Sequence, residues 1–181
     1  GIGSVGTYND TRNMTRNVID QSNLSGQNLK ADAVDTSYIL AETAGVGVAK
    51  SAGLGLAVGV NRINNQTNTL INNSNIQMTG DVSLTALNQP SSAEPDELPD
   101  DVKEITTDAK RSITTIVVGA GVAASGSGLG AGLSGVYSDV HNTAKAKITG
   151  GTTTANKLSL TAKDASDILT VAVAVGAGGS V

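Results

Sequence analysis

The sequence predicts an all-β protein, a parallel β-solenoid in which successive blocks of the chain stack on one another. Three observations carry this prediction. A Gly-x-Gly phrase opens three blocks of similar layout, at Gly1, Gly53 and Gly128. Large apolar and very small residues alternate with a period of two along the glycine-rich runs, as in strands. Self-similarity in a fixed order indicates a repeat architecture, and no stretch has helical periodicity with capping residues.

Each block carries the same signals in the same order. The glycine phrase is followed by a polar stretch rich in Asn and Thr, then by a Leu-x-Ala triplet, and then by an isoleucine that opens a second run of small residues. Turn signals separate these three strand-rich segments. We therefore place the repeats at 1–52, 53–127 and 128–181. The triplets begin at Leu29, Leu84 and Leu160, and the isoleucines are Ile39, Ile113 and Ile168.

Residues 89–110 interrupt the second repeat and account for its extra length. They hold all three prolines of the chain and a cluster of acidic residues. Proline cannot donate to a strand ladder, and clustered charge favours a solvated segment. We expect an inserted loop that protrudes from the solenoid and can be deleted with little change in thermal midpoint.

The acidic cluster of this loop could bind Ca²⁺, but it has neither EF-hand spacing nor the glycine-rich calcium repeat. Its members are Glu94, Asp96, Glu97, Asp100, Asp101 and Glu104.

A block of about 54 residues divides into three coils of about 18, a workable circumference for a β-solenoid. Nine such coils, stacked about 4.8 Å apart, would form a rod of about 40 Å. The sequence begins and stops at the same phase of the repeat, so we expect a slice of a longer rod. Both end faces of such a slice carry unpaired strand edges.

The alternation also predicts which side chains fill the solenoid. We expect the large residues of the alternating runs to point inward and the small residues to face outward, with a corner near Lys50 and another near residues 125–127. The expected interior residues are Val46, Val48, Leu54, Leu56, Val58, Leu169, Val171, Val173 and Val175. The expected outer residues are Gly45, Gly47, Ala49, Gly53, Gly55, Ala57, Gly59, Ala172, Ala174 and Gly176. Glycine is costly in strands, so the sequence predicts close packing against this Gly/Ala face, by self-association or by another segment of the chain.

Composition excludes several function classes. The chain has 22 glycines, three tyrosines, no Phe, Trp or Cys, and a net charge of −4. Without cysteine there are no disulfides or thiolate metal sites. No basic cluster is present, which argues against nucleic-acid binding. The apolar runs 44–60 and 165–181 alternate with glycine, unlike a membrane-spanning helix.

No catalytic, cofactor-binding or metal-ligating residues are predicted. Glycines at 1, 3 and 6, and again at 130, 132 and 135, match the spacing of a dinucleotide fingerprint. That fingerprint requires a following helix, whereas the residues that follow here are polar and turn-prone. His141 is the only histidine and is expected at the surface. The asparagines between Asn61 and Asn75 are expected to form at least one side-chain ladder between coils.

Several phrases resemble the repeat region of large bacterial filamentous adhesins, the filamentous-haemagglutinin-like and leukotoxin-type surface proteins. They are residues 53–61, 80–86 and 173–178. The resemblance covers essentially the whole chain except 89–110. It implies a right-handed parallel β-helix that is secreted or attached to the cell surface. Such proteins are typically exported through an outer-membrane partner and act as filamentous stalks or adhesins.

The expected function is therefore a structural or adhesive segment of an extracellular bacterial surface protein, without enzymatic activity, cofactor or membrane insertion. Its expected partners are neighbouring repeats or copies, held through the Gly/Ala face, and a surface receptor or glycan. The alternative is a carbohydrate-active β-helix domain resembling a polysaccharide lyase or glycosidase. Such an enzyme should have a groove with converging charged residues on one face. A third reading is a passive spacer that displays loop 89–110.

Overall fold

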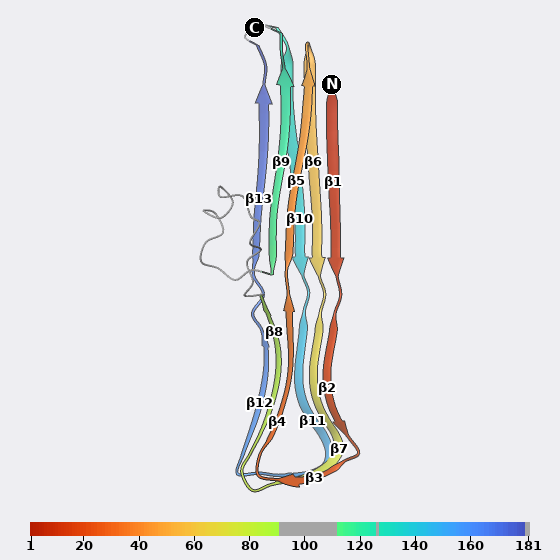
Figure 1. The fold of residues 1–181 in the computed structure, drawn as a ribbon, viewed down its shortest axis with the longest axis vertical. Helices are drawn as coiled ribbons and strands as arrows, with labels where there is room; N and C mark the ends of the chain where they lie inside the picture. Colours follow the sequence, from red (N-terminus) through yellow and green to blue (C-terminus); the bar gives the residue numbers. More distant parts are fainter. Residues whose placement is uncertain (91–111, 126, 180–181) are drawn as a thin grey trace.

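The computed structural model describes residues 1–90, 112–125 and 127–179, which form a flattened parallel β-solenoid of three coils (Figure 1). This confirms the all-β parallel solenoid predicted from the sequence. The first coil contains β1 (Ile2–Thr11), β2 (Met14–Asp20), β3 (Asn23–Gly26), β4 (Leu29–Ser37) and β5 (Ile39–Ala49). The second contains β6 (Ala52–Ile63), β7 (Gln66–Met78), β8 (Asp81–Pro90) and β9 (Ile113–Ala123). The third contains β10 (Leu129–Val140), β11 (Thr143–Thr154), β12 (Lys157–Asp164) and β13 (Ile168–Ala177).

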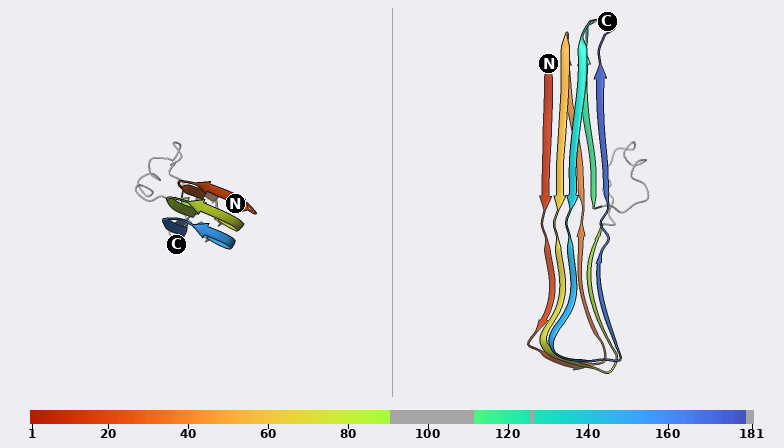
Figure 2. Two further views of the ribbon diagram at one scale, coloured as in Figure 1. Left: turned by 90° about the horizontal axis from the view of Figure 1, so that it is seen from below. Right: turned by 180° about the vertical axis from the view of Figure 1, so that it is seen from behind.

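Corresponding strands of the three coils pair in parallel and build four sheets. Sheet A has the order β1-β6-β10, sheet B the order β11-β7-β2 with β3 also on β7, sheet C the order β12-β8-β4, and sheet D the order β13-β9-β5. The second coil is therefore central in every sheet, and the first and third coils supply the edge strands (Figure 2). Within the described ranges no segment has the length and apolarity of a membrane-crossing helix.

Each sequence repeat forms one complete coil, so the expected division of a repeat into three coils of 18 residues is wrong. Asn9 lies beside Asn61, 52 residues later, and Thr152 beside Asn75 at a separation of 77. The reason is strand length. The second coil is built from four strands of 10 to 13 residues, so it is long and flat, and the nine-coil rod is replaced by a stack of three coils.

The register places the insertion. Leu29 pairs with Val82, but Ile39 pairs with Ile113, so the extra residues lie between β8 and β9. Gln89 and Pro90 are the last residues of β8 and pair with the first coil; they belong to the solenoid rather than to the loop. The expectation that the rest of segment 89–110 protrudes concerns residues 91–110, which lie outside the described ranges.

Sheets A and D pack face to face and form the upper half of the molecule, here called the blade (Figure 1). Toward the tip its interior is lined by glycines and alanines, whereas nearer the waist it also holds Asn61, Thr115 and Val117. The large apolar residues of the alternating runs lie on its outer surface. Val46 and Val48 are 55% and 60% exposed, whereas Ala57 is completely buried. The inward orientation expected for the large residues of the alternating runs is therefore wrong, as is the outward orientation expected for the small ones.

The glycines face inward because the two sheets of the blade lie too close for side chains. A Cβ atom added to Gly55 would overlap the carbonyl oxygen of Ala120 in sheet D, and one added to Gly47 would overlap that of Leu54 in sheet A. Ala172, Ala174 and Gly176 continue the same interior rows in the third coil. The close packing predicted at the Gly/Ala face is thus made within the chain, between its own two sheets.

Sheets B and C form the lower half, here called the base, where larger side chains separate the sheets. The buried cluster there comprises Ala31, Ile71, Ile76, Met78, Val82 and Leu84. A second cluster around Ile63 and Ile113 lies where blade and base meet, the waist of the molecule. The corner expected near Lys50 is confirmed, since β5 ends at Ala49 and β6 begins at Ala52. A second corner separates Ala123 from Leu129, as expected for the 125–127 region.

All three coils turn the outer corner of the base at the same position. Gln21, Asn73 and Gly150 follow the paired residues Asp20, Asn72 and Thr149, and each has positive φ, at 46°, 46° and 68°. The left-handed region is disfavoured for residues with a Cβ, by about 1–2 kcal/mol. Glycine avoids this cost, so the third coil carries the residue best suited to the corner.

Replacing Gln21 by glycine is therefore expected to stabilise the protein. Relief of the left-handed backbone outweighs the added flexibility of the unfolded chain, so we expect a gain of about 0.5–1 kcal/mol in urea denaturation. Gln77→Gly is the matched control, because Gln77 is an exposed strand residue that is not among the positive-φ positions. The control should lose stability, and equal losses in both variants would contradict the corner assignment.

Candidate functional site

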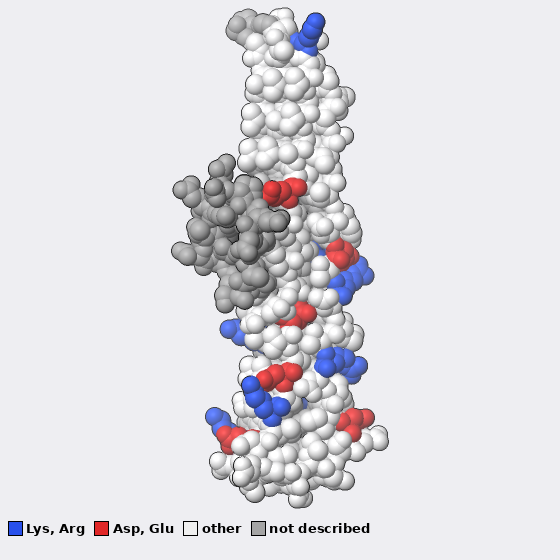
Figure 3. All heavy atoms as spheres, viewed as in Figure 1, with Lys and Arg blue, Asp and Glu red and all other residues white. Residues whose placement is uncertain are grey.

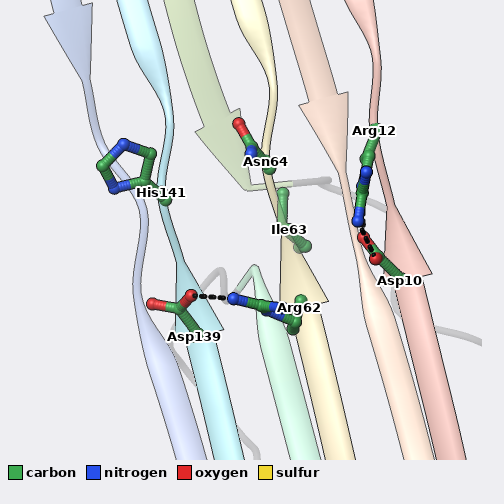
Figure 4. A pocket seen from close by; sticks show the side chains of 7 residues that line it. All are labelled: Asp10, Arg12, Arg62, Ile63, Asn64, Asp139 and His141. Atoms are coloured by element: carbon green, nitrogen blue, oxygen red, sulfur yellow. Dashed lines mark hydrogen bonds and ion pairs between the residues drawn. The ribbon is translucent and has the colours of Figure 1, made fainter.

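A polar groove crosses the outer surface of sheet A at the waist (Figure 4). Its lining residues come from the ends of β1, β6 and β10 and from the turns that follow these strands. They are Asp10, Arg12, Arg62, Ile63, Asn64, Asp139 and His141. The groove thus draws side chains from all three coils.

The parallel register aligns these side chains in two rows across the coils. Asp10, Arg62 and Asp139 occupy equivalent positions in β1, β6 and β10, and this set is here called the charged row. In the turns, Asn64 N donates to the Thr11 carbonyl at 2.8 Å and His141 N donates to the Ile63 carbonyl at 2.8 Å. These bonds extend the register and place Arg12, Asn64 and His141 in the adjacent row.

Both carboxylates of the charged row are paired with arginine. Arg12 donates to Asp10 through Nε at 3.1 Å and through Nη2 at 2.6 Å, a two-pronged contact. Tyr8 Oη also donates to Asp10, at 3.1 Å. Arg62 Nη2 lies 3.7 Å from Asp139 Oδ2 (Figure 4). Alternating acid and base along one row avoids the like-charge pairs that destabilise neighbouring strands.

Hydrogen bonding by Arg12 lowers the pKa of Asp10 below its ordinary value. Tyr8 and Arg62 lower the pKa further by smaller amounts, and partial desolvation of the carboxylate opposes these effects. Asp10 therefore stays ionised to lower pH than a free carboxyl. This is the opposite of what a general acid in glycoside cleavage requires, since that carboxyl must be protonated near neutral pH. Asp10 is suited to hold a charge, not to donate a proton.

Two of the three tyrosines lie on the blade directly above the charged row. Tyr8 and Tyr137 occupy one row with Val60 between them, and they are 64% and 54% exposed. Two strand spacings place them about 9–10 Å apart. In the next row, Gly6 and Gly135 leave the sheet surface low on either side of Val58. Exposed aromatic rings beside a charged row are typical of contact surfaces.

An asparagine row centred on the buried Asn65 fixes the backbone behind the groove. The side-chain oxygen of Asn65 accepts from the backbone N–H of Asn13 at 2.9 Å, and that of Asn142 accepts from the backbone N–H of Asn65 at 2.9 Å. Asn65 also donates to Asp35 Oδ1 and Ser37 Oγ, both at 2.7 Å. Because Asn65, Asp35 and Ser37 are buried, these bonds hold the central turn, which carries Asn64, and tie the turns carrying Arg12 and His141 to it.

The asparagine ladders predicted from the sequence are confirmed. Asn9 donates to Asn61 at 2.7 Å inside the blade, and Asn75 donates to Asn23 at 2.9 Å on the surface of the base. The surface position expected for His141 is also confirmed. The first glycine fingerprint runs from Gly1 into β1 and the second lies within β10. Both strands are followed by further strands, and not by the helix that dinucleotide binding requires. The acidic cluster of 94–104 lies outside the described ranges.

Sequence reasoning missed Tyr8, Tyr137 and the charged row. The phrases alone do not align these residues: Asp10 and Arg62 lie seven residues after the last glycine of their phrases, Gly3 and Gly55, whereas Asp139 lies nine after Gly130. In the structure Gly132, and not Gly130, pairs with Gly55. The three charged residues align only if one repeat is one coil, and the division of each repeat into three coils separated them.

Within the described part of the chain, no three His, Asp or Glu side chains gather where they could hold a metal ion. A scan against protein-family models, a search of curated proteins and a search of solved structures found no match to this chain.

Removing the Arg12 side chain is expected to raise the pKa of Asp10, because Arg12 is the largest cause of its lowering. Arg62→Ala is the matched control and should move it less, since Arg62 acts only through a weaker charge interaction. Carboxyl chemical shifts followed by NMR during a pH titration would measure both. Equal shifts in the two variants would show that the two-pronged contact does not hold in solution.

Proposed function

We propose that this chain is a structural and adhesive segment of an extracellular bacterial filamentous surface protein. The observation that carries the proposal is the in-register stacking of three equivalent coils, with the second coil paired on both sides in every sheet. Such a stack can be extended by adding coils of the same kind, which is how repeat proteins build elongated scaffolds. Within the described ranges, the outer edges of the first and third coils carry backbone groups free to pair in this way.

The exposed composition supports contact rather than chemistry. Large apolar and aromatic side chains cover the outside of the blade, while glycine and alanine line its interior toward the tip. A solvated spacer would be expected to carry polar residues there, because contiguous exposed apolar surface marks interaction sites. The resemblance to filamentous adhesins agrees with this proposal and implies a position outside the cell, at the cell surface.

A carbohydrate-active enzyme is the second candidate, and the charged groove favours it. The groove brings Asp10 and Asp139 to one face of the solenoid, with Tyr8 and Tyr137 beside them. However, each carboxylate is paired with an arginine, and the lowered pKa of Asp10 opposes a role as general acid. These features suit retention of a polar ligand better than its cleavage.

Beads coated with the purified chain test the proposal. We expect them to adhere to cultured cell monolayers, to beads carrying the same chain, or to both. In parallel, the chain is incubated with neutral and acidic polysaccharides, and release of reducing ends or unsaturated sugars is measured. Sugar release that Asp10→Asn and Asp139→Asn abolish, without adhesion to either surface, would replace the adhesive assignment with the enzymatic one. The absence of both adhesion and sugar release would contradict both the adhesive and the enzymatic function.

A further inference from the structure

The charged residues are distributed unevenly over the molecule. In Figure 3 the upper half is almost uncharged, whereas acidic and basic side chains are spread over the lower half. In sheet A, no charged residue precedes Asp10 in β1, Arg62 in β6 or Asp139 in β10. The outer surface of this sheet above the charged row is therefore entirely neutral.

That surface, here called the A face, is formed by the outward side chains of β1, β6 and β10 between the tip of the blade and the charged row. Its large residues on the edge strands β1 and β10 are strongly exposed, with Ile2 at 78% and Leu133 at 55%. On the central strand Leu56 and Val58 are exposed, and Leu54 and Val60 are half-buried. Exposed leucines, isoleucines and valines in such density are unfavourable in water unless covered. The A face comprises Ile2, Ser4, Gly6, Tyr8, Leu54, Leu56, Val58, Val60, Leu129, Ala131, Leu133, Gly135 and Tyr137.

The size of the A face fits a weak contact with a second protein copy. The nine residues of β10 from Leu129 to Tyr137 extend about 30 Å, and three strands span about 14 Å, so the A face covers about 420 Å². Two copies face to face would bury about 850 Å² in total, in the range of weak and transient interfaces. The anatomy also fits, since an apolar centre with tyrosines is bordered by a polar rim, the charged row.

Other occupants fit less well. A lipid bilayer offers no partners for the backbone groups along the outer edges of β1 and β10, and unpaired backbone polar groups are costly in hydrocarbon. A glycan needs polar groups for its hydroxyls, and the rows above Tyr8 and Tyr137 present aliphatic side chains. A second copy can pack on the A face as sheets pack in a sandwich. The edge backbone groups of β1 and β10 then stay in water, and the aliphatic rows meet another apolar surface.

We propose that two copies of this chain associate face to face through their A faces. The outer surface of sheet A on one copy packs on that of the other, and the charged rows lie at the rim of the contact. This inference names the surface for the self-association included in the proposed function and rests on that proposal. Because the contact area is that of a weak interface, we expect a concentration-dependent dimer rather than a permanent one.

Sedimentation velocity of the parent and of three lysine variants over a range of concentrations tests the inference. Val58→Lys places a charge at the centre of the A face. Val18→Lys, in the base, is the matched control, because Val18 is 39% exposed and Val58 is 40% exposed. A lysine is compatible with that row of the base, since Lys147 of the third coil already occupies it. Val46→Lys places the charge on the opposite side of the blade. We expect Val58→Lys to weaken dimerisation about tenfold or more, because an unpaired ammonium is buried, and both controls to associate like the parent.

A second measurement does not depend on the Val58→Lys variant folding. Because the chain has no cysteine, Ser4→Cys can carry an environment-sensitive fluorophore at the edge of the A face, and Ser25→Cys carries the same label at the far end of the base. Only the Ser4 label should change its emission with protein concentration. A concentration response of the Ser25 label alone would overturn the inference.

Three results, two from sedimentation and one from vesicle flotation, would overturn the proposed dimer. They are a parent that stays monomeric at the highest concentration reached, dissociation by Val46→Lys but not by Val58→Lys, and a monomer that floats with neutral phosphatidylcholine vesicles through a Val58-dependent contact. A monomeric parent whose coated beads still adhere to cells would reject this inference alone and leave the proposed function standing.

Discussion

Gly55→Ala is expected to lower the stability of the protein by about 3 kcal/mol or more. The added Cβ would overlap the carbonyl oxygen of Ala120 and lie 2.6 Å from that of Gly45. Both obstacles are backbone atoms of sheet D, in the central and first coils, so they cannot rotate away as a flexible side chain would. Relief requires the two sheets of the blade to separate, which is more costly than ordinary overpacking.

Gly135→Ala is the matched control, since Gly135 lies in another strand of the same sheet but faces outward. A Cβ added there meets no atom within 4 Å. Alanine should be neutral or slightly stabilising at this position, because it reduces the freedom of the unfolded chain. Urea denaturation followed by circular dichroism measures both variants. Equal midpoints for Gly55→Ala and Gly135→Ala would mean that the glycines of β6 do not line the interior.

Asn65→Ala is expected to cost about 2–4 kcal/mol. The asparagine is 1% exposed and donates to the carboxylate of Asp35, which is itself 7% exposed. Its loss would leave that carboxylate with a single side-chain donor, Ser37 at 2.8 Å, and would free the backbone N–H of Asn13. Removing one partner from a buried hydrogen-bonded network costs the desolvation of every group left behind.

Asn75→Ala is the matched control for this network. Asn75 also belongs to an asparagine ladder, with Asn23 and Thr152 as partners at 2.9 Å, but the ladder is exposed. Water replaces the lost bonds there, so the expected cost is below about 1 kcal/mol. A further variant, Asn65→Asp, sets two carboxylates against each other and should gain stability as the pH falls, because one added proton removes the repulsion. A similar loss for Asn65→Ala and Asn75→Ala would show that burial does not decide the strength of these ladders.

The sequence by itself determined the fold class, the strand-rich repeat, the corner near Lys50 and the presence of asparagine ladders. These properties are local or periodic. Glycine phrases, Leu-x-Ala triplets and the period of two all recur along the chain, so reading the order of residues is enough to find them. Even the place of the insertion, between β8 and β9, followed from the prolines that interrupt the second repeat.

Only the tertiary structure decided which face of the alternating strands is inside. A period of two distinguishes two faces but is unchanged when they are exchanged, and the usual preference for large residues inside gave the wrong answer for Val46 and Val48. Toward the tip of the blade, sheets A and D approach so closely that only glycine and alanine fit between them. This distance is a property of two segments far apart in the chain. The same holds for the groove. Asp10, Arg62 and Asp139 become neighbours because one repeat closes one coil, a circumference set by the lengths of the strands and not by any local signal.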